Sequence, residues 1–463
     1  MSLKTKVDLD KELLTKYSVS IPRYTSYPTA PEWTENFIQE DFLKANKTAN
    51  KLQSPISLYF HLPFCESQCY FCACNVVISK RRDVVIPYLE HIKKEIRNLG
   101  TLTDKKRNVE QIHLGGGTPT YFTPYELKDF FSSVQENYNI LRNCEVGIEI
   151  DPRVTTTEHL KVLSELGFNR LSMGIQDFEP KVQEAVNRIQ PYEETKKIFN
   201  LTRELGFNSV NVDLIYGLPH QTVSTFSKTI DLILKLNPDR IALFHYAHLP
   251  QLINHQEKYI STESLPNSDV KIEIFKYAVQ TLTDSGYSFI GLDHFAKPND
   301  ELAKSKDSKT LHRNFQGYTT KANCDLYGFG ITAISNIQDT FSQNIKKLNR
   351  YYEAISTNKL PLSRGITLNK DDLLRKEIIM KILCHGLITK SDIEEKYQIR
   401  FNKYFPTEIE KLKILKKDGL VNLNENTIEV TNIGQFFLRN IACTFDFYLQ
   451  QKNGKQKIYS KTI

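Results

Sequence analysis

The sequence lacks the features that mark membrane, secreted or disordered proteins. No apolar run approaches the ~18 residues that a spanning helix needs, and residues 1–16 carry Lys and Asp where a secretory signal has an apolar core. Eight Cys among 463 residues are too few for a disulfide scaffold. The sequence also has no repeat of fixed period and no low-complexity segment. We therefore expect a globular cytoplasmic protein with reduced thiols and no membrane contact.

The excess of charge of one sign is also small. The chain has 61 Lys and Arg against 54 Asp and Glu, a net charge of +7. This balance suits an acidic substrate or a nucleic acid but selects neither. The length allows about three domains at ~150 residues each.

From about residue 50 to 345, short β-rich runs alternate with helical patterns. The expected strands cover residues 56–61, 109–114, 145–150, 170–175, 209–215, 240–246 and 288–292. Strand followed by helix, repeated in this way, predicts a parallel sheet with helical crossovers. The periodicity alone fits either a doubly wound sheet or a (β/α) barrel. In both folds ligands bind at the carboxyl ends of the strands.

The two ends of the chain and one internal segment depart from this alternation. The Pro-, Tyr- and Thr-rich residues 21–29 predict an extended arm within residues 1–50, and the Lys-, Asp- and Ser-rich residues 297–313 predict a loop. Beyond residue 350 the patterns are helical until two short runs flank Asn424-Glu425-Asn426, which predicts a hairpin. The expected organisation is an arm (1–50) covering the mouth of an α/β unit (51–348), followed by a smaller, mainly helical, winged-helix-like domain (349–463).

Half of the cysteines lie in one short loop directly after the first predicted strand: Cys65, Cys69, Cys72 and Cys74. Core cysteines do not gather in this way, and structural zinc usually pairs two knuckles a dozen or more residues apart. The C-x3-C-x2-C spacing suits three thiolates on one face of a 4Fe–4S cluster, which leaves one iron open to a small molecule. Zinc is the alternative for this loop. The other cysteines are expected to be small core residues: Cys144, Cys324, Cys384 and Cys443.

The cysteine loop resembles the signature of radical S-adenosylmethionine enzymes. Further motifs follow in order: RYTSYPT at 23–29, HLGGGTP at 113–119, EIDPR at 149–153, SMGIQDF at 172–178, DLIYGLP at 213–219, HRNFQGYTT at 312–320 and NIACTFD at 440–446. Together with Cys74 they are similar to the oxygen-independent coproporphyrinogen III oxidases over almost the whole chain. The resemblance implies a partial, TIM-like (β/α) barrel.

That resemblance also implies a reaction. S-adenosylmethionine is cleaved reductively at the open iron, and the 5′-deoxyadenosyl radical starts an anaerobic oxidative decarboxylation. Two propionates of coproporphyrinogen III become vinyl groups, giving protoporphyrinogen IX for heme biosynthesis. The implied electron donor is reduced flavodoxin or ferredoxin, and we expect a monomer. A heme chaperone or heme-degrading enzyme of the same superfamily is the alternative.

The resemblance assigns roles by motif position. Cys65, Cys69 and Cys72 match the cluster ligands, whereas Cys74 matches none. Two S-adenosylmethionine molecules are implied, the first at Tyr59, Gly116, Glu149 and Ile334, the second at Phe71, Gly117, Thr118, Gln176, Arg188, Asp213 and Ala247. Phe315 and Gln316 join Tyr59, Glu149 and Ile334 as the expected catalytic residues. The candidates for holding propionates are Arg23, Arg153 and Arg313, because a guanidinium fork matches a carboxylate.

Several of these residues have plain structural alternatives. The glycines of 115–117 suit a tight turn, and Glu149 or Arg188 suits a salt bridge. The basic residues of the C-terminal region are interleaved with Glu408, Glu410 and Asp418, which indicates a solvated helix face. We therefore expect no nucleic-acid partner.

Overall fold

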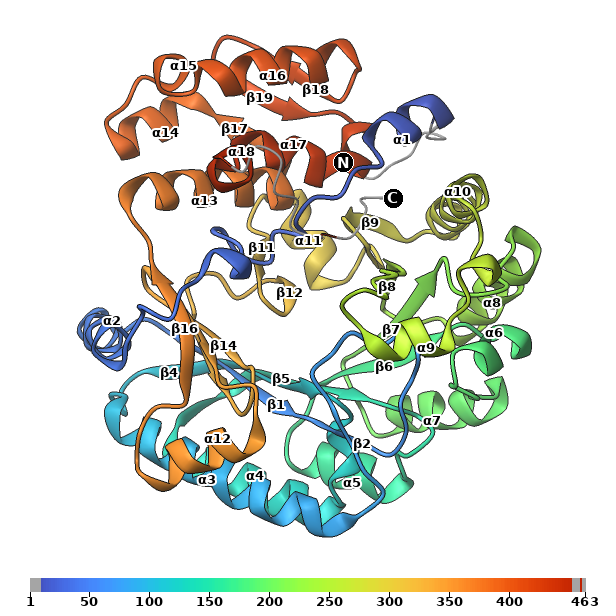
Figure 1. The fold of residues 1–463 in the computed structure, drawn as a ribbon, viewed down its shortest axis with the longest axis vertical. Helices are drawn as coiled ribbons and strands as arrows, with labels where there is room; N and C mark the ends of the chain where they lie inside the picture. The colour runs from blue at the N-terminus through green and yellow to red at the C-terminus, as the bar shows by residue number, and fades with distance from the viewer. Residues whose placement is uncertain (1–9, 452–458, 460–463) are drawn as a thin grey trace.

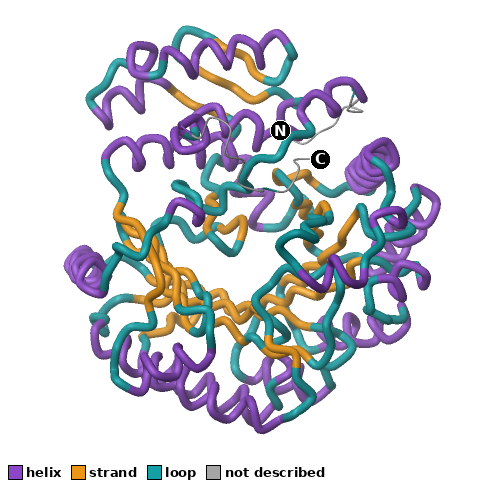
Figure 2. Tube along the Cα trace, viewed as in Figure 1, coloured by secondary structure: helices purple, strands orange, loops and turns teal. Residues whose placement is uncertain are grey.

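The computed structural model describes residues 10–451 and residue 459. Its centre is a twelve-stranded mixed sheet that curves around an interior space, with helices on the outside (Figures 1 and 2). The strand order is β16-β15-β14-β13-β1-β4-β5-β6-β7-β8-β10-β9. No helix among the described residues is both long and apolar enough to span a bilayer.

Six strands at the centre of this sheet are parallel and follow one another along the chain: β1 (Ile56–Leu62), β4 (Asn108–Gly116), β5 (Asn139–Ile150), β6 (Arg170–Gln176), β7 (Ser209–Tyr216) and β8 (Arg240–His245). The helices between them are α3 (Val85–Leu102), α4 (Pro124–Asn137), α5 (Thr157–Glu165), α6 (Pro180–Ala185), α7 (Tyr192–Glu204) and α8 (Val223–Leu236). The predicted α/β alternation is confirmed here.

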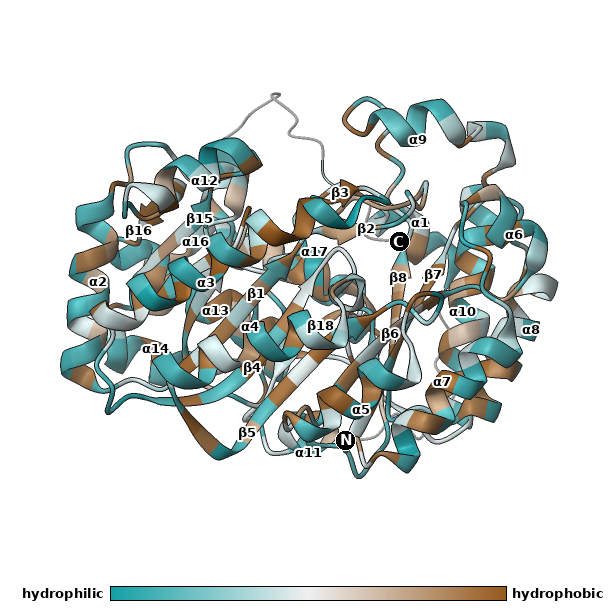
Figure 3. Ribbon diagram, turned by 90° about the horizontal axis from the view of Figure 1, so that it is seen from below, coloured by the Kyte–Doolittle hydropathy of each residue, from teal (hydrophilic) through white to brown (hydrophobic). Residues whose placement is uncertain are grey.

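Side chains of β1 alternate between the helices and the interior. Phe60 is fully buried and meets Phe130 of α4 edge-on, with the ring centroids 5.1 Å apart. Tyr59 and His61 therefore face the opposite side, the interior of the curved sheet. Figure 3 shows brown, apolar residues along the central strands.

The parallel pattern ends at β8, which the sequence did not indicate. The seventh predicted strand is β9 (Ser288–Gly291), but β10 (His294–Ala296) lies between it and β8 and is antiparallel to both. The predicted loop at 297–313 is also wrong in part. It contains α11 (Glu301–Asp307), because the Asp300 side chain caps that helix by accepting Leu302 N at 2.8 Å. The helix α10 (Ser268–Asp284) precedes β9.

On the other side of β1 the sheet continues through β13 (Asp325–Phe329), which is parallel to β1, and then through antiparallel strands. These are β14 (Ile334–Ile337), β15 (Thr340–Asn344) and β16 (Leu362–Thr367), after which α13 (Lys370–His385) begins; α12 (Leu348–Ser356) lies between β15 and β16. The sheet stays open between its edge strands β16 and β9. A small hairpin, β11 (His312–Asn314) and β12 (Gly317–Thr319), lies over the interior (Figure 1).

The predicted arm is an extended segment between two helices, α1 (Lys11–Tyr17) and α2 (Gln39–Leu52); its residues 1–9 lie outside the described residues. It runs between the barrel and the C-terminal helices (Figure 1). Tyr24 donates a hydrogen bond to Asp446 at 2.9 Å. Thr34 pairs with Gly365 of β16, so the arm also covers part of that sheet edge.

The C-terminal region is mainly helical with a small sheet, as expected. Its elements after α13 are β17 (Leu387–Thr389), α14 (Lys390–Tyr397), α15 (Phe401–Tyr404), α16 (Pro406–Lys417), β18 (Val421–Leu423), β19 (Thr427–Val430), α17 (Leu438–Ala442) and α18 (Phe447–Gln451). The predicted hairpin is β18–β19, and β17 pairs with β19.

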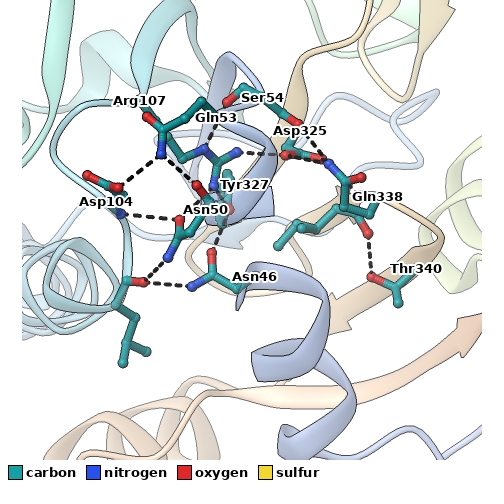
Figure 4. A network of polar contacts seen from close by, with 12 residues as sticks. Asn46, Asn50, Gln53, Ser54, Asp104, Arg107, Asp325, Tyr327, Gln338 and Thr340 are labelled. Atoms are coloured by element: carbon teal, nitrogen blue, oxygen red, sulfur yellow. Dashed lines mark hydrogen bonds and ion pairs between the residues drawn. The ribbon is translucent and has the colours of Figure 1, made fainter. Parts of the chain in front are cut away.

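A buried polar network holds the amino ends of β4 and β13 together (Figure 4). Arg107, fully enclosed, donates to Asp325 at 2.6 Å, to the Tyr327 hydroxyl at 2.6 Å and to the Ser54 carbonyl at 2.8 Å. Its remaining contact is the Asn50 side chain of α2 at 3.2 Å. The network therefore ties α2 to the sheet at the end opposite the cysteine loop.

Candidate active site

The cysteine loop lies at the carboxyl ends of the parallel strands. Its thiols border a cavity of about 460 Å³. The same cavity collects most of the residues expected for cofactor binding: Cys65, Cys69, Phe71, Cys72, Gly116, Gly117, Thr118, Glu149, Gln176, Arg188 and Asp213. All eight cysteines are free.

The glycine turn after β4 packs against the base of the cysteine loop. Gly117 N donates to Leu62 O and Thr118 N donates to Phe64 O, both at 2.9 Å. A Cβ on Gly117 would lie 2.6 Å from the Pro63 carbonyl carbon, so only glycine allows this approach. The Thr118 hydroxyl lies 3.4 Å from Cys65 Sγ. The turn thus supports the loop as well as bordering the cavity.

Two arginines place positive charge beside Cys69. Arg153 Nη2 lies 3.5 Å and Arg188 Nη1 3.6 Å from its sulfur. Both guanidinium groups are ion-paired to Asp151, at 2.6 and 3.0 Å. Burial would raise the pKa of Asp151, but the two guanidinium groups hold it below its ordinary value. Arg188 is therefore no surface residue, and Asp151 is a site residue that sequence reasoning missed.

The donor set of the loop fits an iron–sulfur cluster. Within the described part of the chain, no three His, Cys, Asp or Glu side chains lie close enough together to hold a single metal ion. A 4Fe–4S cube is bound at separate corners, so its thiolates need not converge on one point. Three free thiols around one cavity, with guanidinium groups nearby, match that requirement. The neighbouring Cys74 side chain lowers the pKa of Cys72 below its ordinary value, so Cys74 belongs to the loop's polar structure.

A second cavity, of about 750 Å³, adjoins the first. It is bordered by the expected catalytic residues Tyr59, Glu149, Phe315, Gln316 and Ile334. The two cavities share lining residues: Cys74, Gly116 and Glu149. The structure therefore brings the predicted catalytic residues into one space beside the cysteine loop.

Glu149 is the residue at which the two cavities meet. His113 Nε2 donates to its Oε1 at 3.2 Å, and Gly116 N donates to its Oε2 at 3.4 Å. Burial would raise the pKa of Glu149, but these hydrogen bonds and the His113 ring hold it below its ordinary value. Glu149 is therefore a carboxylate at neutral pH, and its oxygens are hydrogen-bond acceptors.

A chain of rings links Tyr59 to the cysteine loop. The Tyr59 hydroxyl donates to His61 Nδ1 at 3.1 Å, because His61 Nε2 donates to the Asn75 carbonyl at 3.0 Å. Tyr59 also stacks on His113 at an interplanar angle of 13°. Sequence reasoning missed both histidines. The signal was available, since His61 is two residues from Tyr59 on one strand and therefore shares its face.

Gln176 and Asp213 border the cysteine cavity from β6 and β7. Gln176 has φ +71°, a conformation that residues other than glycine rarely adopt and that is common at functional sites. Its Oε1 is buried and, among the described residues, without a hydrogen-bond donor. Burial and the charge of Glu149 raise the pKa of Asp213 to about 6.

Not all predicted residues come together. Ala247 borders a separate cavity of about 770 Å³ after β8; Gln256 Nε2 donates to its carbonyl at 3.3 Å and to that of Phe71 at 3.1 Å. Arg153 lies at the cysteine loop, apart from the other two candidate arginines.

Arg23 and Arg313 lie near the same histidine, His294. The Arg23 guanidinium lies over the Phe244 ring, and that of Arg313 lies over the Tyr318 ring. Both rings pack edge-on against His294. Burial and the neighbouring charge of Arg313 lower the pKa of His294 to about 4. Arg313 Nε and Nη1 are buried without an acceptor in the described part of the chain.

Known proteins match the chain from end to end. Residues 59–233 match the radical SAM superfamily, and residues 368–437 match the HemN C-terminal domain. A relative from Synechocystis sp., named oxygen-independent coproporphyrinogen III oxidase, is 44% identical over 99% of this chain and 98% of its own length. The chain belongs to the oxygen-independent coproporphyrinogen III oxidase family. The Escherichia coli K12 member is 43% identical over 99% of each chain.

A solved structure agrees with this family. "Coproporphyrinogen III oxidase (HemN) from Escherichia coli is a Radical SAM enzyme" superimposes with a TM-score of 0.91 and 42% identity, covering 96% of this chain and 100% of the other. The predicted radical S-adenosylmethionine fold is thereby confirmed. Membership of this superfamily implies a 4Fe–4S cluster and S-adenosylmethionine as cofactors.

Proposed function

We propose that this chain converts two propionate side chains of coproporphyrinogen III to vinyl groups anaerobically, giving protoporphyrinogen IX. The observation that carries the proposal is the shared cavity. Tyr59, Glu149, Phe315, Gln316 and Ile334 border one space that adjoins the cysteine loop, in a chain whose full-length relatives bear that enzyme's name. A heme chaperone or heme-degrading role has no comparable support among these relatives.

We propose Cys65, Cys69 and Cys72 as the cluster ligands, with one iron left open. Their support is the common cavity and the positive charge beside Cys69. When bound, the cluster and S-adenosylmethionine supply a 5′-deoxyadenosyl radical that removes hydrogen from the substrate. The protein binds these cofactors, orients them toward the substrate and excludes competing reactions.

We propose sites for two S-adenosylmethionine molecules. Tyr59, Gly116, Glu149 and Ile334 serve the first, and their support is that all of them border the 750 Å³ cavity. The second uses Phe71, Gly117, Thr118, Gln176, Arg188, Asp213 and Ala247; all but Ala247 border the cysteine cavity. Orphaned polar atoms on Gln176 and Arg188 support a polar ligand there.

For the substrate propionates we propose Arg23 and Arg313. Both guanidinium charges act on His294, and Arg313 has buried donors without acceptors among the described residues. Arg23 is ion-paired to Asp293 at 3.4 Å. Arg153 has less support in this role, because its guanidinium is held more closely, by Asp151 at 2.6 Å, and lies beside Cys69.

The arm contributes to the same region. Trp33 stacks on Phe341 with ring centroids 5.4 Å apart and packs against Phe315 at 5.9 Å. The arm therefore packs against Phe315, which borders the catalytic cavity, and this contact supports the proposal that the arm covers the barrel mouth. For the electron donor we propose reduced flavodoxin or ferredoxin, acidic proteins that suit the net charge of +7. We further propose a monomer that acts in the cytoplasm without nucleic-acid or membrane partners.

The test is anaerobic turnover. The reconstituted protein is given a reductant, S-adenosylmethionine and coproporphyrinogen III, and the products are separated. We expect a tricarboxylate intermediate, protoporphyrinogen IX and 5′-deoxyadenosine. If 5′-deoxyadenosine forms without any decarboxylated product, the proposed substrate is wrong.

A further inference from the structure

The wall of the catalytic cavity formed by β15 and β16 carries two cations that no role assigned above uses. Arg364 of β16 and Lys346, just after β15, border the 750 Å³ cavity together with Tyr59 and Glu149. Among the residues that line it, Glu149 is the sole carboxylate, and it is already bonded to His113 and Gly116. This wall of the cavity is therefore positively charged.

The Arg364 side chain is held in place by its neighbours. Its Nε donates to Gln343 Oε1 at 2.8 Å, and Gln343 Nε2 in turn donates to the Thr332 carbonyl at 3.1 Å. Arg364 and Gln343 are register partners on adjacent strands. The next residue, Gly365, exchanges two backbone hydrogen bonds with Thr34 of the arm, at 2.9 and 3.0 Å. The backbone and the Nε of Arg364 are thus both fixed.

The outer nitrogens of this guanidinium have no protein acceptor. Within the described residues nothing accepts a hydrogen bond from Nη1 or Nη2 of Arg364, and no carboxylate lies at ion-pair distance. The side chain is half-buried, and burial alone lowers its pKa from the ordinary value. A partly desolvated cation without a counter-ion is costly, and a carboxylate ligand removes that cost.

We propose that Arg364 binds a propionate carboxylate of the substrate through Nη1 and Nη2, with Lys346 adding positive charge beside it. This inference rests on the proposed function, which brings a tetracarboxylate into the cavity. A fixed, planar fork suits bidentate binding of a carboxylate better than a flexible ammonium does. The carboxylate of S-adenosylmethionine is the other source of the same chemistry. The proposed first S-adenosylmethionine site borders the same cavity, so the experiment measures the binding of both ligands.

The experiment compares full-length, cluster-reconstituted variants under anaerobic conditions. Arg364→Gln removes the fork, and Arg364→Lys keeps the charge without it. Gln343→Glu places a carboxylate at the Nε of an intact Arg364 and so neutralises its charge from within the protein. Arg350→Gln, on an exposed position of α12 that does not line the cavity, is the matched control. Iron content and thermal unfolding establish that each variant is folded and loaded.

We expect Arg364→Gln and Gln343→Glu to raise the KM for coproporphyrinogen III about 10- to 100-fold, the range of a lost charged hydrogen bond. Arg364→Lys should recover part of this loss, and Arg350→Gln should match the unaltered protein. The dissociation constant of S-adenosylmethionine should change less than about twofold in every variant, within the scatter of surface substitutions.

Two results would overturn the inference. One is a KM for coproporphyrinogen III that Arg364→Gln leaves unchanged. The other is a loss of S-adenosylmethionine affinity as large as the rise in KM, which would assign Arg364 to the cofactor carboxylate. Failure of the proposed function is distinct from both, since the unaltered protein would then not decarboxylate coproporphyrinogen III at all.

Discussion

Arg107 on one side, and Arg313 and Arg364 on the other, show two opposite uses of a partly or fully buried arginine. At the amino ends, Arg107 has an acceptor on each side of its guanidinium: Asp325, Tyr327, Asn50 and the Ser54 carbonyl (Figure 4). By contrast, Arg313 of β11 buries two donors with no acceptor among the described residues, and Arg364 on the catalytic cavity has an acceptor only for Nε. The hydrogen bonds of Arg107 are complete without a ligand, and those of Arg313 and Arg364 are not.

This difference separates stability from function. A buried charge that the protein itself neutralises holds elements together, whereas a buried donor left without a partner costs free energy that only binding can recover. We therefore expect substitutions in the Arg107 network to lower stability and substitutions at the cavity to lower activity.

The largest effect is expected at the cysteine loop. Cys69→Ala should abolish both 5′-deoxyadenosine and decarboxylated product, because a cube with two remaining thiolates is not retained. Iron and sulfide per chain, measured after reconstitution, check this directly. Cys324→Ala, outside the loop, is the control and should keep full iron content. A Cys69→Ala protein that retains its cluster would contradict the ligand assignment.

Arg107→Met tests the arginine whose hydrogen bonds are complete within the protein. We expect a loss of about 3–5 kcal/mol in the free energy of unfolding, because Asp325 is left as a buried charge without its partner. Urea unfolding measures the loss. Arg107→Met combined with Asp325→Asn should be less destabilised than the single variant. A single variant that loses under 1 kcal/mol would break the comparison, as would one that stays stable but no longer turns over substrate.

Glu95 provides a pH test of another enclosed polar group. It accepts hydrogen bonds from Tyr351 at 2.7 Å, Gly330 N at 2.8 Å and Asn344 at 2.8 Å, yet burial raises its pKa to about 7. A carboxyl whose pKa is raised on folding contributes stability at low pH, and that contribution is lost as the pH rises from about 4.5 to about 7. The loss is on the order of 3 kcal/mol.

Glu95→Gln should therefore weaken the pH dependence of unfolding. Urea midpoints of the two proteins at pH 5 and pH 8 measure the difference. From pH 5 to pH 8 the midpoint of the variant should fall by less than that of the unaltered protein. Parallel pH profiles for the two proteins would show that Glu95 is already ionised in the folded state.

Arg313→Gln tests an arginine with buried donors that lack acceptors among the described residues, and it is expected to have the smallest effect on stability. The free energy of unfolding should change by less than about 1 kcal/mol, since no acceptor loses its donor. The KM for coproporphyrinogen III should rise about 10- to 100-fold through loss of a charged hydrogen bond. A variant that unfolds early with an unchanged KM would place Arg313 with Arg107 as a structural residue.

Much of the fold could be predicted because its signals are local. Each central strand is a short β-rich run followed by a helix with its own apolar face, so β1 and β4–β8 were identified correctly. The antiparallel β10 was missed because it has only three residues, too few for a periodic signal. The helix α11 was hidden by charged residues, which here face solvent beyond a buried Leu302 and Ala303.

The candidate site divides in the same way. The cysteine loop is contained in ten consecutive residues, so its spacing alone indicates a cluster. The pairing of His113 with Glu149 joins two strands, and that of Arg364 with Gln343 joins the last two strands of the sheet. The two residues of each pair lie in different segments of the sequence. No motif or spacing around Arg364 or Lys346 indicates a site.

The sequence by itself determined the chemistry that this protein can hold, because thiolate spacing, glycine turns and strand-end carboxylates are encoded within a few residues of each other. Only the tertiary structure decided which charges are satisfied. An arginine has the same side chain in Arg107, Arg188 and Arg313, and its role depends on whether a carboxylate from a distant segment reaches it. That contact is long-range, and the curvature of the sheet sets it.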